Sequence, residues 1–449
     1  MKTRYIAWIL LAVVPFFISG CIGPGYPPNE QIMDPRMVFD SFGNIITAFQ
    51  MNAGNGPLTY IKKIGQDGKE LWFNTLDSRQ PEMQTRKDPR PSYTELIDAG
   101  NGEVVIVWNY QSQIYITKLD VNGQPVWKDK FIKVGEIKNY RLRRTFKSPE
   151  GFTVVWVDSK NNLNVQTVDT SGNLLLSSGG FIKNVLVFSA ICDDEGKIWL
   201  VWDQSLDKVV HILKMNAHGQ SEWPNAITLS PELSDKSTPL SYSEYSFWVN
   251  EDDSGNIIVC WANNWMGDGL NLNKLDSQGN ILWNKENLHV GKSFGSEYRI
   301  ADDGAGGIFV YWDYGPSTYG QHIVAGGQAV WDENGTEIIR DNGGGIVDAC
   351  PDGSDGTVII WKNNYLFYAQ HIDSNGTKLW DDDGIIVSDK FSSYMNSGEH
   401  AWSHTNPMVI SNNAGSFFVS YGVLTSHSLI QKIDEDGTLP WGLTGLNLR

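Results

Sequence analysis

The sequence is poor in cysteine and in basic residues. It holds 4 cysteines in 449 residues, and none of them forms a Cys-x-x-Cys pair. Cys192, Cys260 and Cys350 each lie in or beside an apolar run, so we expect buried thiols rather than a disulfide framework or a metal site. Lys and Arg number 35 against 52 Asp and Glu, which gives a net charge of −17. This balance argues against nucleic acid or anionic lipid as the main partner, because both attract basic surfaces.

Helical periodicity is also lacking, and the one long apolar run lies at the N-terminus. Lys2 and Arg4 precede the run from Ile6 to Ile18, which is too short to span a bilayer comfortably and predicts a signal peptide. The residues Ile18-Ser19-Gly20-Cys21 resemble the lipobox of bacterial lipoproteins. The resemblance implies that Cys21 is diacylated and becomes the mature N-terminus. A plain secretory signal with a chance cysteine is the alternative.

A lipidated chain is expected at the cell envelope, anchored on the extracytoplasmic side of a membrane. Two or more acyl chains give stable anchoring, whereas a single chain is marginal. Ile22 follows Cys21, so the Asp that retains such lipoproteins in the inner membrane is absent, but the choice between outer and cytoplasmic membrane stays open. Without Lys2 and Arg4 the mature chain carries 33 basic and 52 acidic residues, a net charge of −19.

A short phrase recurs along the rest of the chain. "KLDVNGQPVW", "KLDSQGNILW" and "HIDSNGTKLW" each hold a Gly followed four residues later by Trp. Eight such pairs occur, one of them with Leu in place of Trp: Gly68/Trp72, Gly123/Trp127, Gly172/Leu176, Gly219/Trp223, Gly279/Trp283, Gly327/Trp331, Gly376/Trp380 and Gly437/Trp441. Their mean spacing is about 53 residues, slightly above the ~40–50 typical of one propeller blade.

A second pattern counts the same number of repeats. Once per period, a Gly is followed five or six residues later by an aromatic residue: Gly43/Phe49, Gly102/Trp108, Gly151/Trp156, Gly196/Trp202, Gly255/Trp261, Gly306/Trp312, Gly356/Trp361 and Gly415/Tyr421. The two patterns hold 13 of the 18 Trp, so most of the indoles are expected to be architectural.

Each period is predicted to form four strands. Segments such as "NIIVCW" and "GIFVYW" are apolar at successive positions, which predicts strands buried on both faces. Turns such as "DDSGN" and "DSQGN" favour hairpins. One period is expected to contain strand A ("EYRIAD"), strand B ("GIFVYW"), strand C ("GQHIV") and strand D ("QAVW"), whose final Trp packs against the next blade.

The predicted fold class is all-β, an eight-bladed β-propeller of four-stranded antiparallel blades. It is expected to occupy residues 34–449, after a signal peptide (1–20) and a lipidated Cys with a flexible tether (21–33). The chain starts with its own strand A ("RMVFDS") and ends with its own strand D. Blade 8 is therefore expected to pack on blade 1 without exchanging a strand.

The Gly-x-x-x-Trp repeat resembles that of the PQQ-like (quinoprotein-type, BamB-like) propellers, over about residues 34–449. That family includes dehydrogenases and lipid-anchored assembly factors, so the resemblance supports the eight-bladed fold. The family's docking motif usually has Asp four residues before the Gly, whereas Asp120, Asp276, Asp373 and Asp434 stand three residues before it. No haem or dedicated cofactor motif is present, so no cofactor is predicted.

Three other kinds of motif are not expected to form catalytic or metal-binding sites. "GKSFG" at 291–295 matches Gly-x-Ser-x-Gly, but β-type segments lie on both sides where a nucleophile elbow needs a helix. The acidic clusters Asp381–Asp383 and Asp434–Asp436 lack the rest of a calcium loop and are expected to be turns. His400 and His404 have a metal-ligand spacing only on a helix, and no helix is predicted there. No catalytic or metal-binding residues are therefore predicted.

Two sets of residues are candidates for binding. The basic run "YRLRRTFK" lies on strand A of blade 3, so Arg141, Arg143 and Lys147 could form an anion site in the central channel; the alternative is pairing with neighbouring acids. The long connections between strands B and C and between strands D and A hold Trp265 and Trp402, and Tyr314 and Tyr319 flank another B–C loop. Loops on a rigid scaffold concentrate binding residues, so this face is the candidate binding face; locally packed aromatics are the alternative.

The sequence thus predicts a lipid-anchored extracytoplasmic propeller that acts as a binding or scaffold module for a protein or glycan partner. An extracellular enzyme acting on polysaccharide or a small molecule at the channel is the alternative. Catalysis is the less favoured of the two, because no pair of carboxylates or general base is evident on the predicted A strands.

Overall fold

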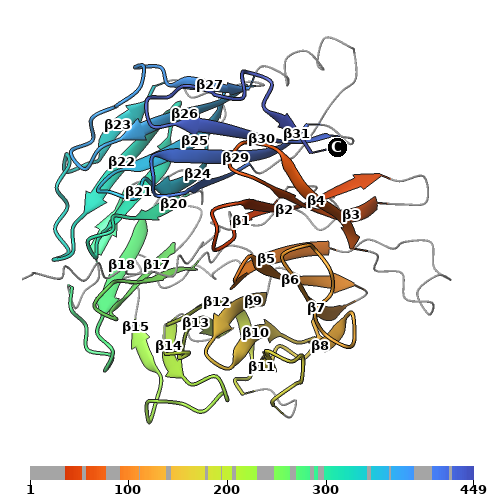
Figure 1. Cartoon of the computed structure of the whole chain (residues 1–449). Coiled ribbons are helices and arrows are strands. Elements are labelled where there is room, and N and C mark those ends of the chain that lie inside the picture. The colour runs from red at the N-terminus through yellow and green to blue at the C-terminus, as the bar shows by residue number, and fades with distance from the viewer. Residues whose placement is uncertain are drawn as a thin grey trace, which may run out of the picture.

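Eight antiparallel sheets are arranged in a ring around a central axis (Figure 1). The computed structural model of the chain describes residues 36–52, 57–76, 92–110, 112–137, 143–176, 181–193, 195–204, 209–229, 247–262, 269–283, 288–291, 298–340, 345–363, 366–388, 407–423 and 427–448. Within these ranges the secondary structure is all-β. None of these residues belongs to a helix long and apolar enough to cross a membrane. The fold is the predicted eight-bladed β-propeller.

The strands follow one another in chain order from the axis outward. Blades 1 to 4 comprise β1 (Arg36–Phe39), β2 (Ile45–Asn52), β3 (Pro57–Ile64) and β4 (Glu70–Leu76); β5 (Ser92–Gly100), β6 (Glu103–Tyr110), β7 (Gln113–Leu119) and β8 (Ile132–Glu136); β9 (Arg143–Ser148), β10 (Gly151–Val157) and β11 (Leu163–Asp169); β12 (Val185–Cys192), β13 (Ile198–Gln204), β14 (Val210–Met215) and β15 (Ile227–Leu229). In blade 3 the described residues that follow β11 pair with it through two isolated bridges, Leu163 with Ile182 and Val168 with Leu174.

Blades 5 to 8 have four strands each. They comprise β16 (Phe247–Glu251), β17 (Ile257–Ala262), β18 (Leu270–Leu275) and β19 (Leu288–Val290); β20 (Tyr298–Asp302), β21 (Ile308–Tyr314), β22 (Ser317–Ile323) and β23 (Thr336–Ile339); β24 (Ile346–Pro351), β25 (Thr357–Asn363), β26 (Leu366–Ile372) and β27 (Ile385–Ser388); β28 (Met408–Ser411), β29 (Ser416–Val423), β30 (His427–Asp434) and β31 (Leu446–Asn447). The first strand of each blade is strand A, which lies next to the A strands of neighbouring blades around the axis.

The B strands are buried on both faces, as their unbroken apolar sequences predicted. Every residue of β10 is buried, and so are the first five residues of β21. Each hydrophobic cluster joins two successive blades: one joins Val358 and Ile360 of blade 7 to Phe417 and Val419 of blade 8. The core of the protein is therefore a series of interfaces between blades, and the three described cysteines are buried in it as thiols, with no disulfide among them.

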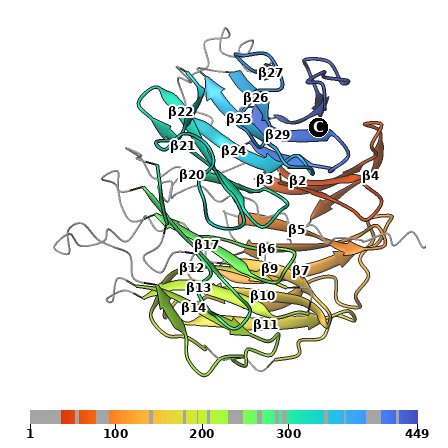
Figure 2. The same ribbon diagram turned by 90° about the vertical axis from the view of Figure 1, so that its left-hand side faces the viewer.

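Ring closure takes place by packing of blade 8 on blade 1, as predicted. Figures 1 and 2 both show β29, in blue, beside the red and orange strands of blade 1. Met37 and Phe49 of blade 1 share one apolar cluster with Phe418 of blade 8. Lys62 of β3 also donates a hydrogen bond to the carbonyl oxygen of Leu448, at 3.3 Å. No strand is exchanged between the two blades, because each sheet holds its own consecutive strands.

The Trp of each repeat packs on the next blade, as predicted. In five blades its indole nitrogen donates a hydrogen bond of 2.8–3.0 Å to a carbonyl oxygen in the next C–D turn: Trp72 to Val121, Trp127 to Thr170, Trp283 to Ala325, Trp331 to Ser374 and Trp380 to Glu435. The ring also covers the Gly of that turn. A Cβ atom on Gly327, whose φ is +83°, would lie 2.9 Å from the ring of Trp283. The repeat needs glycine there both for its backbone conformation and for the approach of the indole.

The predicted position of strand D is wrong in blade 6, and the same displacement holds in most other blades. The segment "QAVW" forms only an isolated bridge between Ile323 and Ala329, and the fourth strand, β23, begins after Trp331. The reason is a side-chain amide in strand C. Gln321 accepts a hydrogen bond from the amide of Trp331 and donates one to the carbonyl oxygen of Asp332, in place of a backbone ladder.

Leu176 occupies the position that Trp fills in the other blades. Gln166 binds the amide and carbonyl of Leu176, at 2.9 and 2.8 Å, much as Gln370 binds the amide of Trp380. Leu176 packs against the apolar cluster that blades 3 and 4 share. The ring of Phe181, however, covers Gly219 of blade 4, where an added Cβ atom would lie 2.4 Å from the ring. Blade 3 thus keeps an aromatic contact with blade 4 through a different residue.

Replacement of a docking indole tests the contact between blades. Trp283→Ala should lower the free energy of unfolding by about 3–5 kcal/mol, because it leaves a cavity and an unpaired carbonyl, whereas Trp283→Phe should cost about 1 kcal/mol for the lost hydrogen bond. Urea denaturation followed by circular dichroism measures both. The neighbouring Leu282 is 47% exposed, so Leu282→Ala serves as the control and should change stability by less than about 0.5 kcal/mol. Equal stability of Trp283→Ala and wild type would contradict the docking role.

Candidate functional site

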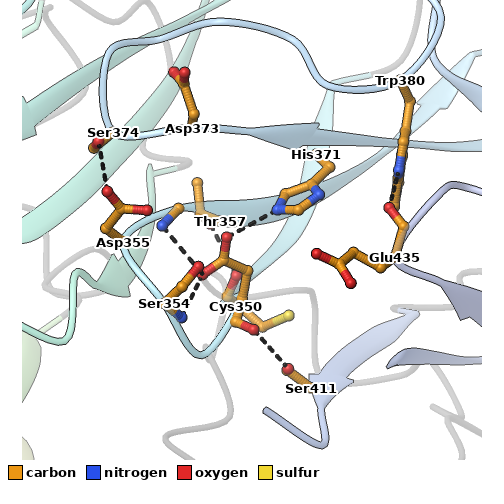
Figure 3. A network of polar contacts seen from close by, with 12 residues as sticks. Cys350, Ser354, Asp355, Thr357, His371, Asp373, Ser374, Trp380, Ser411 and Glu435 are labelled. Atoms are coloured by element: carbon orange, nitrogen blue, oxygen red, sulfur yellow. Dashed lines mark hydrogen bonds and ion pairs between the residues drawn. The ribbon is translucent and has the colours of Figure 1, made fainter. Parts of the chain in front are cut away.

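A network of polar contacts lies at the A–B turn of blade 7 (Figure 3). One carboxylate oxygen of Asp352 accepts hydrogen bonds from the amides of Ser354 and Gly356, at 2.7 and 3.1 Å. The other oxygen lies 2.8 Å from Nε2 of His371 in strand C. The carbonyl oxygen of Asp352 is also 3.5 Å from the hydroxyl of Ser411 in blade 8. Asp352 therefore closes its own turn and links that turn to strand C of blade 7 and to strand A of blade 8.

Equivalent pairs recur around the ring, which identifies the network as part of the architecture. In five blades an Asp of the A–B turn pairs with a Lys or His of strand C: Asp40 with Lys63 at 2.6 Å, Asp193 with Lys214 at 3.0 Å, Asp252 with Lys274 at 2.6 Å, Asp303 with His322 at 2.9 Å and Asp352 with His371 at 2.8 Å. Lys63 and Lys274 continue to a carbonyl oxygen in the next blade, Gly102 and Gly306 respectively. We call these pairs the turn clamps.

The two histidine clamps differ in their second ring nitrogen. Nδ1 of His322 lies 3.1 Å from the carbonyl oxygen of Ser374 in blade 7, and Nε2 lies 2.9 Å from Asp303. Both neighbours are acceptors, so both contacts are satisfied together when the ring carries two protons. Nδ1 of the buried His371 has no hydrogen-bond partner among the described residues, so a neutral ring satisfies its contact with Asp352. The two clamps are alike in position and unlike in the protonation that suits them.

The turn clamps of Asp352 and Asp303 lower the pKa of the carboxyl group. Burial raises the pKa of Asp352, but hydrogen bonds from His371 and from Ser354 outweigh burial and bring the pKa to about 2. In Asp303 the same burial is outweighed by the hydrogen bond with His322 and by two turn amides, so its pKa is lowered. The fold thus favours the ionised form of both carboxyl groups, as expected of structural ion pairs.

Three carboxyl groups of the A strands, those of Asp98, Asp302 and Asp348, show the opposite shift, and it is large in the last two. Burial raises the pKa of Asp302 to about 6, against hydrogen bonds from the amide of Gly304 and from Asn250 of blade 5. Burial also raises the pKa of Asp348 to about 6, against a hydrogen bond of 2.9 Å from the amide of Val409 in blade 8. Each of these last two carboxyl groups links its own A strand to an A strand next to it. These are the strongest pKa perturbations near the axis, and perturbed carboxyl groups mark candidate functional positions.

The predicted channel arginines occupy different places. Arg141 lies outside the described residues. Arg143 is directed into the interface with blade 2, where it contacts Asn109 and the carbonyl oxygen of Val107 and pairs with Glu95 at 3.4 Å. This is the pairing alternative rather than the channel site, because strand alternation turns the side chain of Arg143 toward blade 2.

Lys147 is exposed and lies at the turn end of β9. Its Nζ atom is 3.2 Å from the position that a Cβ atom on Gly100 would take, and its charge acts on Asp98 of blade 2. Lys147 and Arg143 therefore do not converge on one site.

The predicted aromatic face is described only in part. Trp265 and Trp402 lie outside the described residues, as do Ser293, His400 and His404. Tyr314 is 41% exposed at the end of a tight hairpin, since it pairs with Ser317. Tyr319 stacks on Trp312 and meets Tyr314 edge to face, both at a centroid distance of 6.3 Å. The structure therefore brings together the two predicted tyrosines.

The acidic clusters form turns, as predicted. The amide of Gly384 donates to the carbonyl oxygen of Asp381 at 2.7 Å, and the amide of Gly437 donates to that of Asp434 at 2.8 Å. Over the described ranges, no three His, Cys, Asp or Glu side chains are grouped so that they could hold a metal ion.

The sequence interpretation overlooked Arg36, Arg144, Arg299 and Asp348. All four lie on A strands, opposite the residue that precedes the B-strand aromatic: their partners are Ala48, Val155, Tyr311 and Ile360. The repeated aromatic residues could have located this level of the ring from the sequence, if the pairing register of strands A and B had been known.

A single clamp can be tested through the pH dependence of stability. The pKa of Asp352 in the fold is about 2, below the ordinary value of 3.8, so ionised Asp352 stabilises the fold above about pH 4 and loses this effect as the pH falls toward 2. Asp352→Asn should therefore cost about 2 kcal/mol at pH 6 and about 1 kcal/mol at pH 3, measured by urea denaturation. The exposed Asp382→Asn is the matched control. An equal loss at both pH values would show that the ionised pair does not account for the effect.

Comparisons with known proteins give only distant structural similarity. No protein-family model and no curated protein sequence matches the chain. Among solved structures, the chain is similar to the BP39L lectin from Burkholderia pseudomallei, with a TM-score of 0.48, 10% identity, and coverage of 78% of this chain and 98% of the lectin. The polysaccharide lyase Uly1 gives a TM-score of 0.46 and 10% identity, over 78% of this chain and 90% of the lyase. A eukaryotic initiation factor gives 0.45 and 11%, over 89% and 84%. Such distant similarity carries no inference about what this chain binds.

Proposed function

We propose that this chain is a lipid-anchored extracytoplasmic β-propeller that binds a protein or glycan partner at the cell envelope. Cys21 would carry the lipid, and the ends of the blades that hold the B–C and D–A connections would bind the partner. We call these ends the loop face, and we call the opposite ends, with the A–B and C–D turns, the turn face. The proposal rests on a difference between the described residues of the two faces. Polar groups of the turn face are engaged within the fold, whereas the loop face presents an exposed tyrosine.

The polar groups of the turn face are engaged in contacts within the fold. Its Asp side chains close the turns and pair with strand C, and its carbonyl oxygens accept hydrogen bonds from the docking indoles. The turns are also short and alike, with the same backbone bond from a Gly amide to the carbonyl oxygen of an Asp in Gly123, Gly279 and Gly376. Side chains committed in this way are poorly suited to binding a specific partner.

The exposed tyrosine of the loop face is the observation that carries the proposal. Tyr314 presents its ring at the end of a rigid hairpin, and Tyr319 supports it from the stack on Trp312. An aromatic side chain held in this way can pack against a sugar ring or an apolar side chain at little entropic cost. The predicted loop residues Trp265 and Trp402 would extend the same face.

The first test concerns the anchor. In wild-type cells the protein should fractionate with membranes, whereas Cys21→Ser should accumulate as an uncleaved precursor or a soluble form, because no acyl chain can be attached. Cell fractionation with metabolic labelling by a palmitate analogue measures both. Equal membrane partition of a correctly processed Cys21→Ser protein would contradict the lipid anchor.

The second test concerns the loop face. Affinity purification of the lipidated protein from its own envelope, together with a glycan array, identifies the partner and its class. Tyr314→Ala, and Trp265→Ala with Trp402→Ala, should each weaken capture about tenfold or more while leaving the thermal midpoint nearly unchanged, since hot-spot aromatics contribute 2 kcal/mol or more. Phe42, an aromatic residue 60% exposed on the turn face, provides the matched control Phe42→Ala. Unchanged capture by the loop-face variants, or their unfolding, would contradict the proposal.

A further inference from the structure

Charge is distributed unevenly around the ring. Residues 36–183, which contain blades 1 to 3, hold 19 Lys and Arg against 15 Asp and Glu, a net charge of +4. Residues 184–449, which contain blades 4 to 8, hold 14 against 35, a net charge of −21. Blades 1 to 3 follow one another around the ring, in red to yellow (Figure 1). The net charge of the whole chain argues against contact with anionic lipid, but this arc has no part in the negative excess.

The outer segments of this arc, from each C–D turn onward, expose many large apolar side chains. In the described parts of residues 65–76, 120–136 and 169–183, seven such side chains are 39–53% exposed: Leu71, Phe73, Val121, Val126, Leu174, Leu175 and Phe181. The described outer segments of the five other blades together present only five: Leu282, Val330, Leu379, Ile386 and Leu443. Apolar exposure is therefore concentrated on the same three blades that lack the negative charge.

Contacts between successive blades hold these three segments side by side. Trp72 donates a hydrogen bond of 2.9 Å to the carbonyl oxygen of Val121, and Trp127 donates one of 3.0 Å to that of Thr170. The exposed side chains thus belong to one outer rim that runs over three blades. We call residues 65–76, 120–136 and 169–183 the apolar rim.

The apolar rim also carries exposed lysines: Lys69, Lys128, Lys130, Lys133 and Lys183. Lys69 pairs with Asp67 at 2.7 Å, whereas the other four make no ion pair with the described residues. The rim holds these five lysines against six acids, while the corresponding residues 216–229, 276–290, 324–339, 373–388 and 434–447 hold two against 13. The rim is therefore nearly neutral where the rest of the outer edge is strongly acidic.

Three further acids of the rim are engaged within the fold. Glu70 pairs with Lys62 at 3.0 Å. Asp120 and Asp169 each accept a hydrogen bond of 2.9 Å from an amide of their own turn. The rim thus presents apolar side chains and lysines to the solvent, with most of its acids turned to structural contacts.

The proposed lipid anchor joins the chain next to this arc. Residues 22–35 lie between Cys21 and β1, and 14 residues can span at most about 50 Å when fully extended. Strand D of blade 1 lies only about 15 Å from strand A, because neighbouring strands are about 4.8 Å apart. The tether is therefore long enough for the rim of blade 1 to reach the bilayer that holds the lipid.

We propose that the apolar rim of blades 1 to 3 lies on the surface of that bilayer, with its lysines among anionic headgroups. Exposed apolar side chains enter the interfacial region of a membrane, and lysines are attracted to anionic lipid. The same headgroups repel blades 4 to 8, so the charge distribution selects one orientation. The C–D turns belong to the turn face, so the loop face points away from the bilayer. The inference deepens the proposed function and rests on its lipid anchor.

Lysine footprinting of the lipidated chain tests this orientation. The chain is placed in vesicles of phosphatidylethanolamine and phosphatidylglycerol or in detergent, acetylated with a water-soluble reagent and analysed by mass spectrometry. Lys128, Lys130 and Lys133 should react at least about threefold more slowly in vesicles, because the headgroups cover them. Lys160, exposed on the B–C connection of blade 3, is the control and should react equally in both.

Equal reactivity of the rim lysines in vesicles and in detergent would overturn the inference. Protection found in native envelopes but not in protein-free vesicles would mean that a protein covers the rim, and it would overturn the inference as well. The mass of the same sample shows whether Cys21 is acylated. An acylated chain with an unprotected rim leaves the proposed function standing, whereas a chain without the lipid contradicts the proposed anchor.

Variants of the rim test its two components separately. Leu174→Ser with Leu175→Ser should reduce the protection of Lys133 about twofold or more, because fewer apolar side chains enter the interface. Lys128→Glu with Lys130→Glu should reduce it as well, through charge, and covers the case in which the first variant does not fold.

Leu379→Ser with Leu443→Ser is the matched control, since these side chains of blades 7 and 8 are 51% and 48% exposed and lie outside the rim. This control should leave the protection of Lys133 unchanged. If both rim variants keep the protection seen in wild type, the inference fails.

Discussion

The indole that one blade inserts against the turn of the next is the contact on which the rest of this structure depends. A four-stranded sheet of this size cannot bury both of its faces alone, yet the B strands are apolar on both. The ring solves this by placing every sheet between two others. The docking indole fixes the spacing of neighbouring sheets, because its ring covers a glycine and its nitrogen donates to the carbonyl oxygen two residues before that glycine, as Trp283 does with Gly327 and Ala325. The turn clamps add an ionic contact at the same end of the blades.

This arrangement divides the molecule into two kinds of surface. On the turn face, repeated Asp, Lys and His side chains hold the backbone, and hydrogen bonds in this role lower the pKa of Asp352 to about 2. Near the axis, burial outweighs the neighbouring hydrogen bonds and charges and raises the pKa of Asp302 and Asp348 to about 6. The first kind of carboxyl group is fixed in one state over a broad pH range, whereas the second can change its charge under mild conditions.

The repeat count, the buried B strands and the closure of the ring were predictable from the sequence, because glycine and tryptophan at fixed spacing report a local geometry that every blade needs. The position of the fourth strand was not predictable in the same way, since the side chain of Gln321 replaces the expected ladder. The charged A-strand residues Arg36, Arg144, Arg299 and Asp348 were missed for a different reason. A shift of one residue in register exchanges Arg143 for Arg144, and strand alternation then sends one to the blade 2 interface and the other to Phe188. Trp265 and Trp402 stay predictions, because they lie outside the described residues.

The claim that all eight blades form one closed, mutually docked ring can be measured by native-state hydrogen–deuterium exchange with mass spectrometry. In a closed ring, the B strands of the terminal blades, β2 and β29, should open with the same free energy as β10 and β25, because blade 8 docks on blade 1 as the other blades dock on their neighbours. In an open array of repeats, the terminal units lack one neighbour and open first. Uniform protection of the four strands is the predicted result; early exchange confined to β2 and β29 would contradict the account.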